Sequence, residues 1–380
     1  MLHYLSRGSV PAKPHTVFRD ARGKLLYEEC FTRRGFDTEF SILYHEGPPQ
    51  VDEEIGPSEG DPRLRVAATL APPQPLRRRL VLGENAPQGV TPILASEDVV
   101  VSLERHPPME SDIGFSNGDG DDLHFVYSGK AVLETPFGDL PVGEGDYVLV
   151  PRGVPHRFRV LEALEGIVFE LRGGFHLPVQ FRNPVGQLKM DAPFTHRDFR
   201  APGFTGPRPG PSEILVKKGD RFVKRRPRSS VFDVVGWDGT VWPFAFPILA
   251  YQPKTGLIHL PPTIHATFAA PGLLFCSFVP RVTDTHPDAI PCPYPHTSVD
   301  CDEVIYYVRG NFTSRKGVGP RAISLHPMGV PHGPHPGSYE ASIGTRSTDE
   351  LAVMMDTFRP LSLTTQALAL EHTPYHESWK

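Results

Sequence analysis

Three residues in the second half of the chain have side chains that commonly bind transition metals. Six residues separate His296 from Glu303, and His332 follows after a segment that begins with the strand-like run VIYYVRG. Two neutral imidazole nitrogens and one carboxylate form the three-point face that holds non-haem Fe(II) and leaves positions open for a substrate and O2. We therefore hypothesise that this part of the chain carries an iron site.

The composition favours a β protein that could build such a site. The 43 Pro and 35 Gly residues are about a fifth of the 380 residues, which favours many short strands over long helices. The length suggests two domains, or one large β domain with extensions. A formal net charge of -5 argues against nucleic acid as the main partner, because no surplus of Lys and Arg exists to neutralise phosphates.

The cysteines and the N-terminal residues suggest a cellular location. The four cysteines are too few and too scattered for a disulfide scaffold, and none forms a CxxC zinc pattern. The N-terminal residues lack an apolar core of roughly 7 to 15 residues, so no signal peptide is expected. No apolar run approaches a membrane span of roughly 18 residues. We expect a soluble, reduced, cytoplasmic protein with no membrane partner.

Two parts of the chain can be aligned with one another. DDLHFVYSGKA and GDYVLVPRGVPHRF match DEVIYYVRGNF and RAISLHPMGVPHGP further along. Asp122 and Glu303 are 181 residues apart, as are Gly129 and Gly310, whereas PRGVPH and PMGVPH are 176 residues apart. An internal repeat of this kind indicates a duplicated module.

The repeated residues resemble the cupin superfamily, whose second motif is a Gly followed after five residues by P-x-G-x-x-H. The first copy fits this motif from Gly145 to His156, and the second copy keeps all but the leading Gly and ends at His332. The resemblance implies a mainly β bicupin with two jelly-roll β-barrel or sandwich domains. Inward-pointing side chains from neighbouring strands would then converge inside the barrel.

The first copy lacks the metal ligands of the second. FSNGDGDD, residues 115–122, contains no His and has an Asp in the place of the Glu. We interpret this copy as a degenerate, metal-free cupin in which His124 and His156 are ordinary polar or core histidines. We expect residues 1–215 to form an extended arm and this domain, and residues 216–380 to form the catalytic cupin domain.

More specifically, the chain resembles the homogentisate 1,2-dioxygenase family. The resembling segments are RGSVPAKPHTVFRD, FVPR, PYPH, EVIYYVRG and SLHPMGVPHGP. The resemblance implies a homo-oligomer based on trimers that opens homogentisate with O2 to maleylacetoacetate in tyrosine and phenylalanine catabolism. It implies Fe(II) bound by His296, Glu303 and His332, a catalytic acid-base His259, and substrate contacts from Tyr294, His326 and Arg315.

Several positions depart from the family pattern. The first histidine and the glutamate are one residue further apart than usual, so Asp302 is a rival ligand, although the alignment of EVIYYVRG favours Glu303. Thr297 and Ser298 stand where the family tends to carry Arg-Asn, and Phe312 where it has a Tyr. A related cupin dioxygenase for gentisate or another hydroxylated aromatic acid is therefore an alternative. A cupin isomerase or a non-catalytic metal-binding protein is a third.

Two polar segments have simpler interpretations. The basic stretch KKGDRFVKRRPRSS, residues 217–230, is expected to be a solvated loop, with contact to an anionic ligand or another subunit as the alternative. The polar ending EHTPYHESWK, residues 371–380, is expected to be a surface terminus.

Overall fold

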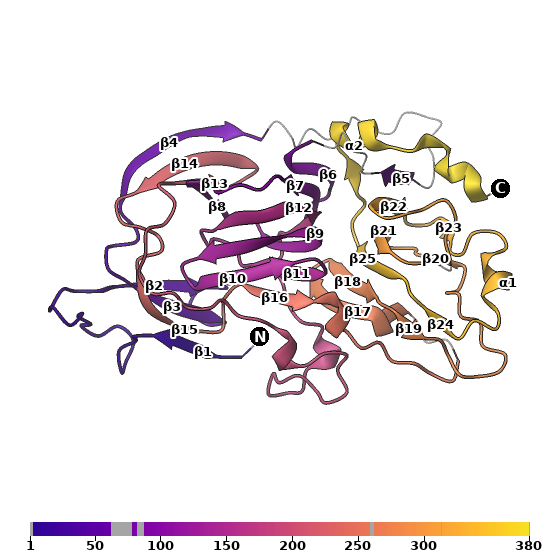
Figure 1. The fold of residues 1–380 in the computed structure, drawn as a ribbon, viewed down its shortest axis with the longest axis horizontal. Coiled ribbons are helices and arrows are strands. Elements are labelled where there is room, and N and C mark those ends of the chain that lie inside the picture. Colours follow the sequence, from indigo (N-terminus) through magenta and orange to yellow (C-terminus); the bar gives the residue numbers. More distant parts are fainter. Residues whose placement is uncertain (1–2, 62–77, 82–86, 259–261, 313, 380) are drawn as a thin grey trace. The chain divides into compact units, whose positions relative to one another are not determined.

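The computed structural model describes residues 3–61, 78–81, 87–258, 262–312 and 314–379 (Figure 1). The fold is mainly β, as the composition and the repeat predicted. No helix among the described residues is both long enough and apolar enough to cross a membrane.

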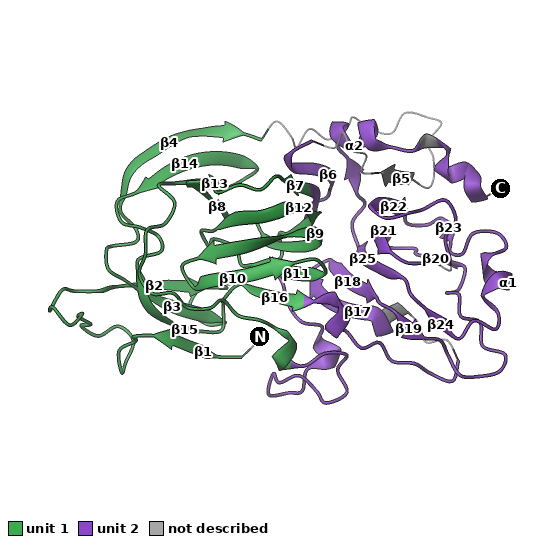
Figure 2. Cartoon of the chain, in the orientation of Figure 1, with its two compact units in different colours: residues 1–62, 104–174, 196–246 green, residues 63–103, 175–195, 247–380 purple. Residues whose placement is uncertain are grey.

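The chain forms two compact units that alternate along the sequence (Figure 2). Unit 1 contains residues 1–62, 104–174 and 196–246, and unit 2 contains residues 63–103, 175–195 and 247–380. The single division after residue 215 that the sequence suggested does not follow these units. The reason lies in long-range strand pairing, since residues 234–239 form a strand between two strands from the first 45 residues.

Unit 1 contains three antiparallel or mixed sheets, and the N-terminal residues are part of them. The first sheet has the order β1 (Leu5–Gly8), β15 (Val234–Gly239), β3 (Phe40–His45), β2 (Tyr27–Thr32). The second has the order β4 (Asp52–Gly60), β14 (Arg221–Pro227), β13 (Glu213–Lys217), β8 (Ile113–Asn117). The third contains β16 (Phe244–Pro247), β11 (Asp146–Val150), β9 (Asp121–Thr135) and β12 (Arg157–Leu171), with β10 (Gly138–Gly143) on β9.

Unit 2 is built on one antiparallel sheet with smaller pairs beside it. The sheet has the order β17 (Ala266–Ala270), β18 (Leu273–Phe278), β25 (Leu351–Thr357), β21 (Asp302–Arg309), β22 (Ala322–His326), β5 (Arg78–Val81). The two-stranded sheets are β20 (His296–Thr297) with β23 (Pro331–His332) and β19 (Arg281–Val282) with β24 (Ser347–Thr348). In addition, β6 (Gly89–Ala95) pairs with β26 (Ser362–Leu363). Strand β7 spans Val99–His106.

The helices that the structure describes are short. They are the α-helices α1 (Ser338–Ser342) and α2 (Thr365–Leu370) and the 3₁₀ segments η2 (Val179–Phe181), η3 (His196–Asp198), η4 (Ile248–Ala250), η5 (Pro262–His265) and η6 (Thr373–Trp379).

The two halves of the sequence repeat form the same structure. In unit 1, β9 pairs with β11 and β12, and in unit 2, β21 pairs with β22 and β25. Asp122 of β9 lies opposite Val150 of β11, and Glu303 of β21 lies opposite His326 of β22. These two pairs are related by the same offsets as the sequence repeat. The chain is therefore a bicupin, as expected.

The repeated glycines have the same conformation in both copies. Gly129 has φ +94° and Gly310 has φ +95°, a region that residues with a side chain rarely adopt. A Cβ would lie 2.2 Å from the carbonyl oxygen of Ala163 at Gly129, and 2.3 Å from that of Asp349 at Gly310. Glycine is needed at both positions for conformation and for space.

Strand β21 presents its two acidic residues to opposite sides. Side chains alternate along a strand, so Glu303, Ile305 and Tyr307 share one face and Asp302 belongs to the other. Ile305 and Tyr307 belong to the core of unit 2. The core cluster contains Ala266, Cys276, Ile305, Tyr307, Phe312, Ala322, Ala352 and Met354. Glu303 therefore lies at the end of an inward-facing row whose other members are apolar or aromatic.

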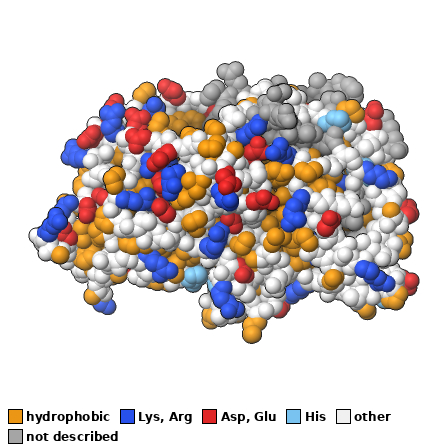
Figure 3. Space-filling model, in the orientation of Figure 1, with side chains coloured by type: hydrophobic (Ala, Val, Ile, Leu, Met, Phe, Trp, Pro, Cys, Tyr) orange, Lys and Arg blue, Asp and Glu red, His pale blue; other side chains and the backbone are white. Residues whose placement is uncertain are grey.

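The basic stretch at residues 217–230 is not a loop, so that expectation was wrong. Half of it is β14, which is hydrogen-bonded on one side to β4 and on the other to β13. Its charges are paired within the chain, with Arg225 Nε 2.6 Å from Asp52 and Arg226 Nη1 2.9 Å from Glu54. On the face that Figure 3 draws, basic and acidic side chains are interspersed and do not form one basic patch.

Candidate metal centre

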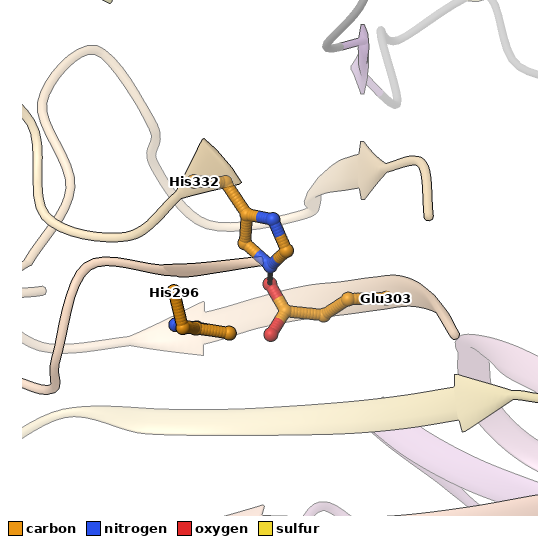
Figure 4. A group of neighbouring side chains, drawn as sticks. All are labelled: His296, Glu303 and His332. Carbon is orange, nitrogen blue, oxygen red and sulfur yellow. Dashed lines mark ion pairs between the residues drawn. The ribbon is translucent and has the colours of Figure 1, made fainter. Parts of the chain in front are cut away.

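The structure brings the two predicted histidines and the glutamate together in unit 2. His296 of β20 lies directly opposite His332 of β23, and their ring centroids are 4.3 Å apart. Glu303 reaches them from β21, so that one ligand atom of each residue lies within 4.8 Å of those of the other two. In Figure 4 the imidazole of His332 and the carboxylate of Glu303 point toward one another.

Both imidazoles are oriented by backbone carbonyl groups. Nδ1 of His296 donates to the carbonyl oxygen of Tyr294 over 2.8 Å, and Nδ1 of His332 donates to that of Val330 over 2.9 Å. Because a carbonyl can only accept, each ring keeps its proton on Nδ1 and has a lone pair on Nε2. Nε2 of His332 is buried and has no hydrogen-bond partner among the described residues. A buried, unpaired nitrogen lone pair is what a metal ligand offers before its ion is bound.

The third donor is an ionised carboxylate. Burial alone would raise the pKa of Glu303, but the hydrogen bond from His326 and the positive charge of Arg315 hold this pKa below its usual range. Burial lowers the pKa of His332, despite the attraction of Glu303, so this imidazole is neutral near pH 7. One carboxylate and two imidazole donors match the preference of divalent transition metals.

Glu303 is positioned by the residue directly opposite it. Nδ1 of His326 lies 2.6 Å from Oε1 of Glu303, and the side chain of His326 is fully buried. Burial lowers the pKa of His326 to about 4, so the neutral ring donates its Nδ1–H to the carboxylate. Asp356 lies opposite Glu303 on the other side, and burial together with the charge of Glu303 raises its pKa to about 7.

Asp302 accepts hydrogen bonds from the backbone and does not face the two histidines. Its Oδ1 accepts the backbone N–H of Met328 over 2.7 Å, and its Oδ2 accepts the backbone N–H of Leu361 over 2.7 Å. Both carboxylate oxygens of Asp302 are therefore occupied by backbone N–H groups. Among the described residues, the candidate metal-binding group contains Glu303 and not Asp302. The geometry selects Glu303 as the carboxylate of the site.

In unit 1 two of the three corresponding positions carry different side chains, with Phe115 for His296 and Asp122 for Glu303. Phe115 lies opposite His156 in an isolated antiparallel bridge, as His296 lies opposite His332. The ring of Phe115 packs edge-on against His156 with centroids 5.6 Å apart. His156 still donates its Nδ1–H to the carbonyl of Val154 over 3.0 Å. The ring of His156 is therefore oriented as that of His332 is, although a phenyl group stands in the place of the other histidine ligand.

A second group of carboxylates in unit 1 is also close enough to surround a cation. Asp119, Glu170 and Asp220 have ligand atoms within 4.8 Å of one another. The ammonium group of Lys217 lies 2.5 Å from Glu170 and 3.0 Å from Asp220. The protein's own ammonium group therefore supplies the positive charge, and this group needs no metal ion.

Comparison with known proteins agrees with this geometry. The sequence model for the N-terminal part of homogentisate 1,2-dioxygenase matches residues 101–248. A protein of Saccharolobus solfataricus, provisionally named a dioxygenase, is 32% identical over 391 residues, covering 100% of this chain and 99% of its own. Homogentisate 1,2-dioxygenases of Bradyrhizobium diazoefficiens and Rhodopseudomonas palustris are 28% and 29% identical over 70% of this chain. The chain belongs to the homogentisate 1,2-dioxygenase family.

The chain aligns with only part of those two family members, 62% and 63% of their lengths respectively. Among solved structures, a cupin 2 conserved barrel domain protein from Leptotrichia buccalis matches with a TM-score of 0.36 and 10% identity, over 73% of this chain and 92% of that one.

The remaining site residues that the family resemblance predicts have different surroundings. His259 lies outside the described residues. Tyr294 has a side chain that is 52% exposed, and its backbone carbonyl orients His296. Arg315 is buried, donates from Nη1 to the carbonyl of Gly333 over 2.6 Å, and has Nη2 3.5 Å from Glu303. Its Nε is buried with no hydrogen-bond partner among the described residues, so one donor remains for an anionic group.

The C-terminal residues lie at the surface, as expected, with His372, Pro374, Glu377 and Ser378 exposed, but two aromatic side chains among them contact this region. Tyr375 of η6 is buried, and its hydroxyl lies 3.5 Å from Nε2 of His326. Trp379 stacks on His335 with ring centroids 4.1 Å apart. The signal in the sequence was two aromatic side chains in an otherwise polar ending, since aromatic residues bury large apolar areas when they can.

Proposed function

We propose that this protein is a non-haem Fe(II) dioxygenase that opens the ring of homogentisate with O2 to give maleylacetoacetate. The reaction balances as one homogentisate plus one O2, with both oxygen atoms in the product. We also propose His259 as the acid-base residue and substrate contacts from Tyr294, His326 and Arg315. The family resemblance supports a trimer-based assembly, a cytoplasmic location, and a role in tyrosine and phenylalanine catabolism.

One observation carries the proposal. Two imidazoles and one ionised carboxylate converge, with Glu303 and His332 buried and His296 half-buried, in a chain whose relatives carry dioxygenase names. Two histidines and one carboxylate occupying one face of an ion are typical of non-haem Fe(II) oxygenases. The unpaired Nε2 of His332 and the fixed tautomers of both rings support a resident divalent ion.

When bound, Fe(II) would supply the redox chemistry that allows an aromatic ring to react with O2. His296, Glu303 and His332 would hold the ion. His326 keeps Glu303 oriented and ionised through its Nδ1–H. The apolar residues on the inward face of β21 limit water near the reacting groups.

Substrate orientation is assigned to residues around this centre. The free Nε–H of Arg315 suits the side-chain carboxylate of homogentisate, because a charge-assisted hydrogen bond to a carboxylate is strong when buried. Tyr294 supplies an exposed phenol beside the first ligand. His259 would accept the proton of a ring hydroxyl, a task that suits an imidazole whose pKa is near neutrality.

The test is oxygen uptake by protein loaded anaerobically with Fe(II). We expect uptake with homogentisate in a ratio of one O2 per molecule of maleylacetoacetate formed, and loss of both iron and turnover in His332→Ala. A His332→Ala protein with full iron content and full turnover would overturn the assignment. Stoichiometric Zn or Mn with no oxygen uptake would favour a cupin isomerase or a non-catalytic metal-binding protein.

A related substrate is the second candidate, and Phe312 supports it. Phe312 is buried and packs edge-on against Tyr307 with centroids 4.7 Å apart, so this position offers no hydroxyl group to a substrate. Gentisate or another hydroxylated aromatic acid would need fewer polar contacts to its side chain. Parallel oxygen uptake with gentisate decides between the two, since the preferred substrate has the higher kcat/KM.

A further inference from the structure

The C-terminal 3₁₀ segment η6 contacts the supports of Glu303 by two routes, one through Tyr375 and one through Trp379. All of the residues involved belong to unit 2. Both routes end at Glu303, and the ring of His326 also stacks on His332 with centroids 5.1 Å apart.

The first route passes through His326. The ring of His326 donates Nδ1–H to Glu303, which leaves its Nε2 as the atom that faces the next hydrogen-bond partner. The hydroxyl of Tyr375 lies 3.5 Å from this Nε2, and the two rings are nearly parallel with centroids 6.5 Å apart. The phenol therefore stabilises the tautomer of His326 that orients Glu303.

The second route passes through Arg315. The guanidinium carbon of Arg315 lies 5.7 Å from the ring centroid of Trp379, within the range of a cation–π interaction. Trp379 is itself stacked on His335, whose Nε2 lies 2.8 Å from Oγ of Ser378 in the same segment. Arg315 in turn places Nη2 3.5 Å from Oε1 of Glu303. The indole therefore holds the guanidinium group that lies against the carboxylate of Glu303.

We propose that η6 is a built part of the metal centre, in which Tyr375 and Trp379 are positioning residues that hold Glu303 in its ligand orientation through His326 and Arg315. The proposal rests on the proposed function in one respect, namely that His296, Glu303 and His332 bind a divalent metal. Residues that orient metal ligands typically change metal affinity by about 10-fold to 100-fold when they are replaced. Single substitutions of Tyr375 and Trp379 test the proposal.

The experiment measures metal release from the full-length protein, without substrate. The variants are Tyr375→Phe, which keeps the buried ring and removes only the hydroxyl, and Trp379→Leu, which removes the indole. The matched control is Tyr4→Phe, which removes a hydroxyl that donates to Asp238 over 2.7 Å in unit 1. Each protein is loaded with Co(II), and the rate of transfer to a chelator and the visible absorption of the bound Co(II) are recorded.

We expect both η6 variants to release Co(II) about 10-fold faster than the parent protein and to shift its absorption bands, because the carboxylate ligand is less constrained. The Tyr4→Phe control should release Co(II) at the parental rate with an unchanged spectrum. Parental rates and spectra in both η6 variants would overturn the inference. If Tyr375→Phe only lowered the stability of the fold, the Co(II) that remains bound would keep the parental absorption bands. A shift of these bands therefore distinguishes a positioning role of Tyr375 from a purely stabilising one.

The outcome for η6 is separable from the outcome for the proposed reaction. Faster release and shifted bands in the variants, with no oxygen uptake by the Fe(II)-loaded parent, would support the inference and contradict the ring-cleaving function. Oxygen uptake by the parent, with parental metal release in both variants, would contradict the inference and support the ring-cleaving function. A parent protein that binds neither Co(II) nor Fe(II) would overturn both.

Discussion

His326 lies directly opposite Glu303 on the neighbouring strand and donates its Nδ1–H to the carboxylate over 2.6 Å. A carboxylate that binds metal with one oxygen has a second set of lone pairs, and a hydrogen bond to them fixes its orientation. The cupin repeat has Val150 at the corresponding position of unit 1, opposite Asp122. A histidine at this position therefore distinguishes the copy that carries the candidate metal site.

Removal of this hydrogen bond should weaken metal binding. We expect His326→Leu to bind Fe(II) or Co(II) about 10-fold to 100-fold more weakly than the parent protein, as measured by chelator competition. The side-chain amide of Asn can present an N–H close to the position of Nδ1, so His326→Asn should retain more affinity than His326→Leu. Equal affinity in all three proteins would show that the contact has no part in metal binding.

Substitutions of the adjacent residues Glu303 and Asp302 should affect different properties, metal binding in one case and stability in the other. Glu303→Gln should lose most bound metal while its thermal unfolding changes little, because the amide is a poor ligand of similar size. Asp302→Asn should instead lower the free energy of unfolding by about 1 to 3 kcal/mol, since one of two backbone N–H groups loses its acceptor. Metal analysis and urea unfolding of both variants check this, and a metal-free Asp302→Asn protein would make Asp302 the ligand.

Lys217 should be a major contributor to the stability of unit 1. Its buried ammonium group lies between Glu170 and Asp220, so Lys217→Met leaves their charges without this partner. Removing one partner from a buried ion pair typically costs about 3 to 5 kcal/mol, and we expect the lower end because Arg172 also contacts both acids.

Lys218→Met is the matched control for this prediction. The neighbouring Lys218 side chain is 72% exposed and lies 3.8 Å from Asp119, so its loss should change the free energy of unfolding by less than about 1 kcal/mol. Urea unfolding of both variants measures the difference. Equal stability of the two variants would mean that the cluster around Lys217 is not stabilising.

His45 should make the stability of unit 1 depend on pH in the alkaline range. Burial alone would lower the pKa of His45, but its hydrogen bonds to Asp233 and Glu29 raise the pKa to about 9. Because this pKa is raised on folding, the added stability is fully present below the unfolded pKa near 6.5 and is lost as the pH rises through 9. The change corresponds to about 3 kcal/mol.

The comparison with His45→Gln isolates this contribution from other titrating groups. The difference in free energy of unfolding between parent and variant should be largest at pH 6 and should shrink by about 3 kcal/mol above pH 9.5. Denaturant unfolding at the two pH values measures it. A difference that does not change with pH would show that His45 is not protonated in the folded protein.

The domain organisation illustrates what the sequence could not provide. The repeat was visible because both copies keep the spacing between a strand, a glycine and a P-x-G-x-x-H turn, and these are short-range features. The division into units was not visible, because β15 joins strands from the first 45 residues by hydrogen bonds to residues about 200 positions away. Pairing over such distances depends on how hydrophobic faces meet, and local pattern does not encode that.

By itself, the sequence determined the mainly β class, the duplicated module and the set of ligand types, because strand composition, turn glycines and metal-binding side chains are local properties. Only the tertiary structure decided between Asp302 and Glu303, since strand register sets which of two adjacent side chains faces His332. The tertiary structure also decided that η6 belongs to the site, because the burial of Tyr375 depends on packing against residues that are distant in sequence.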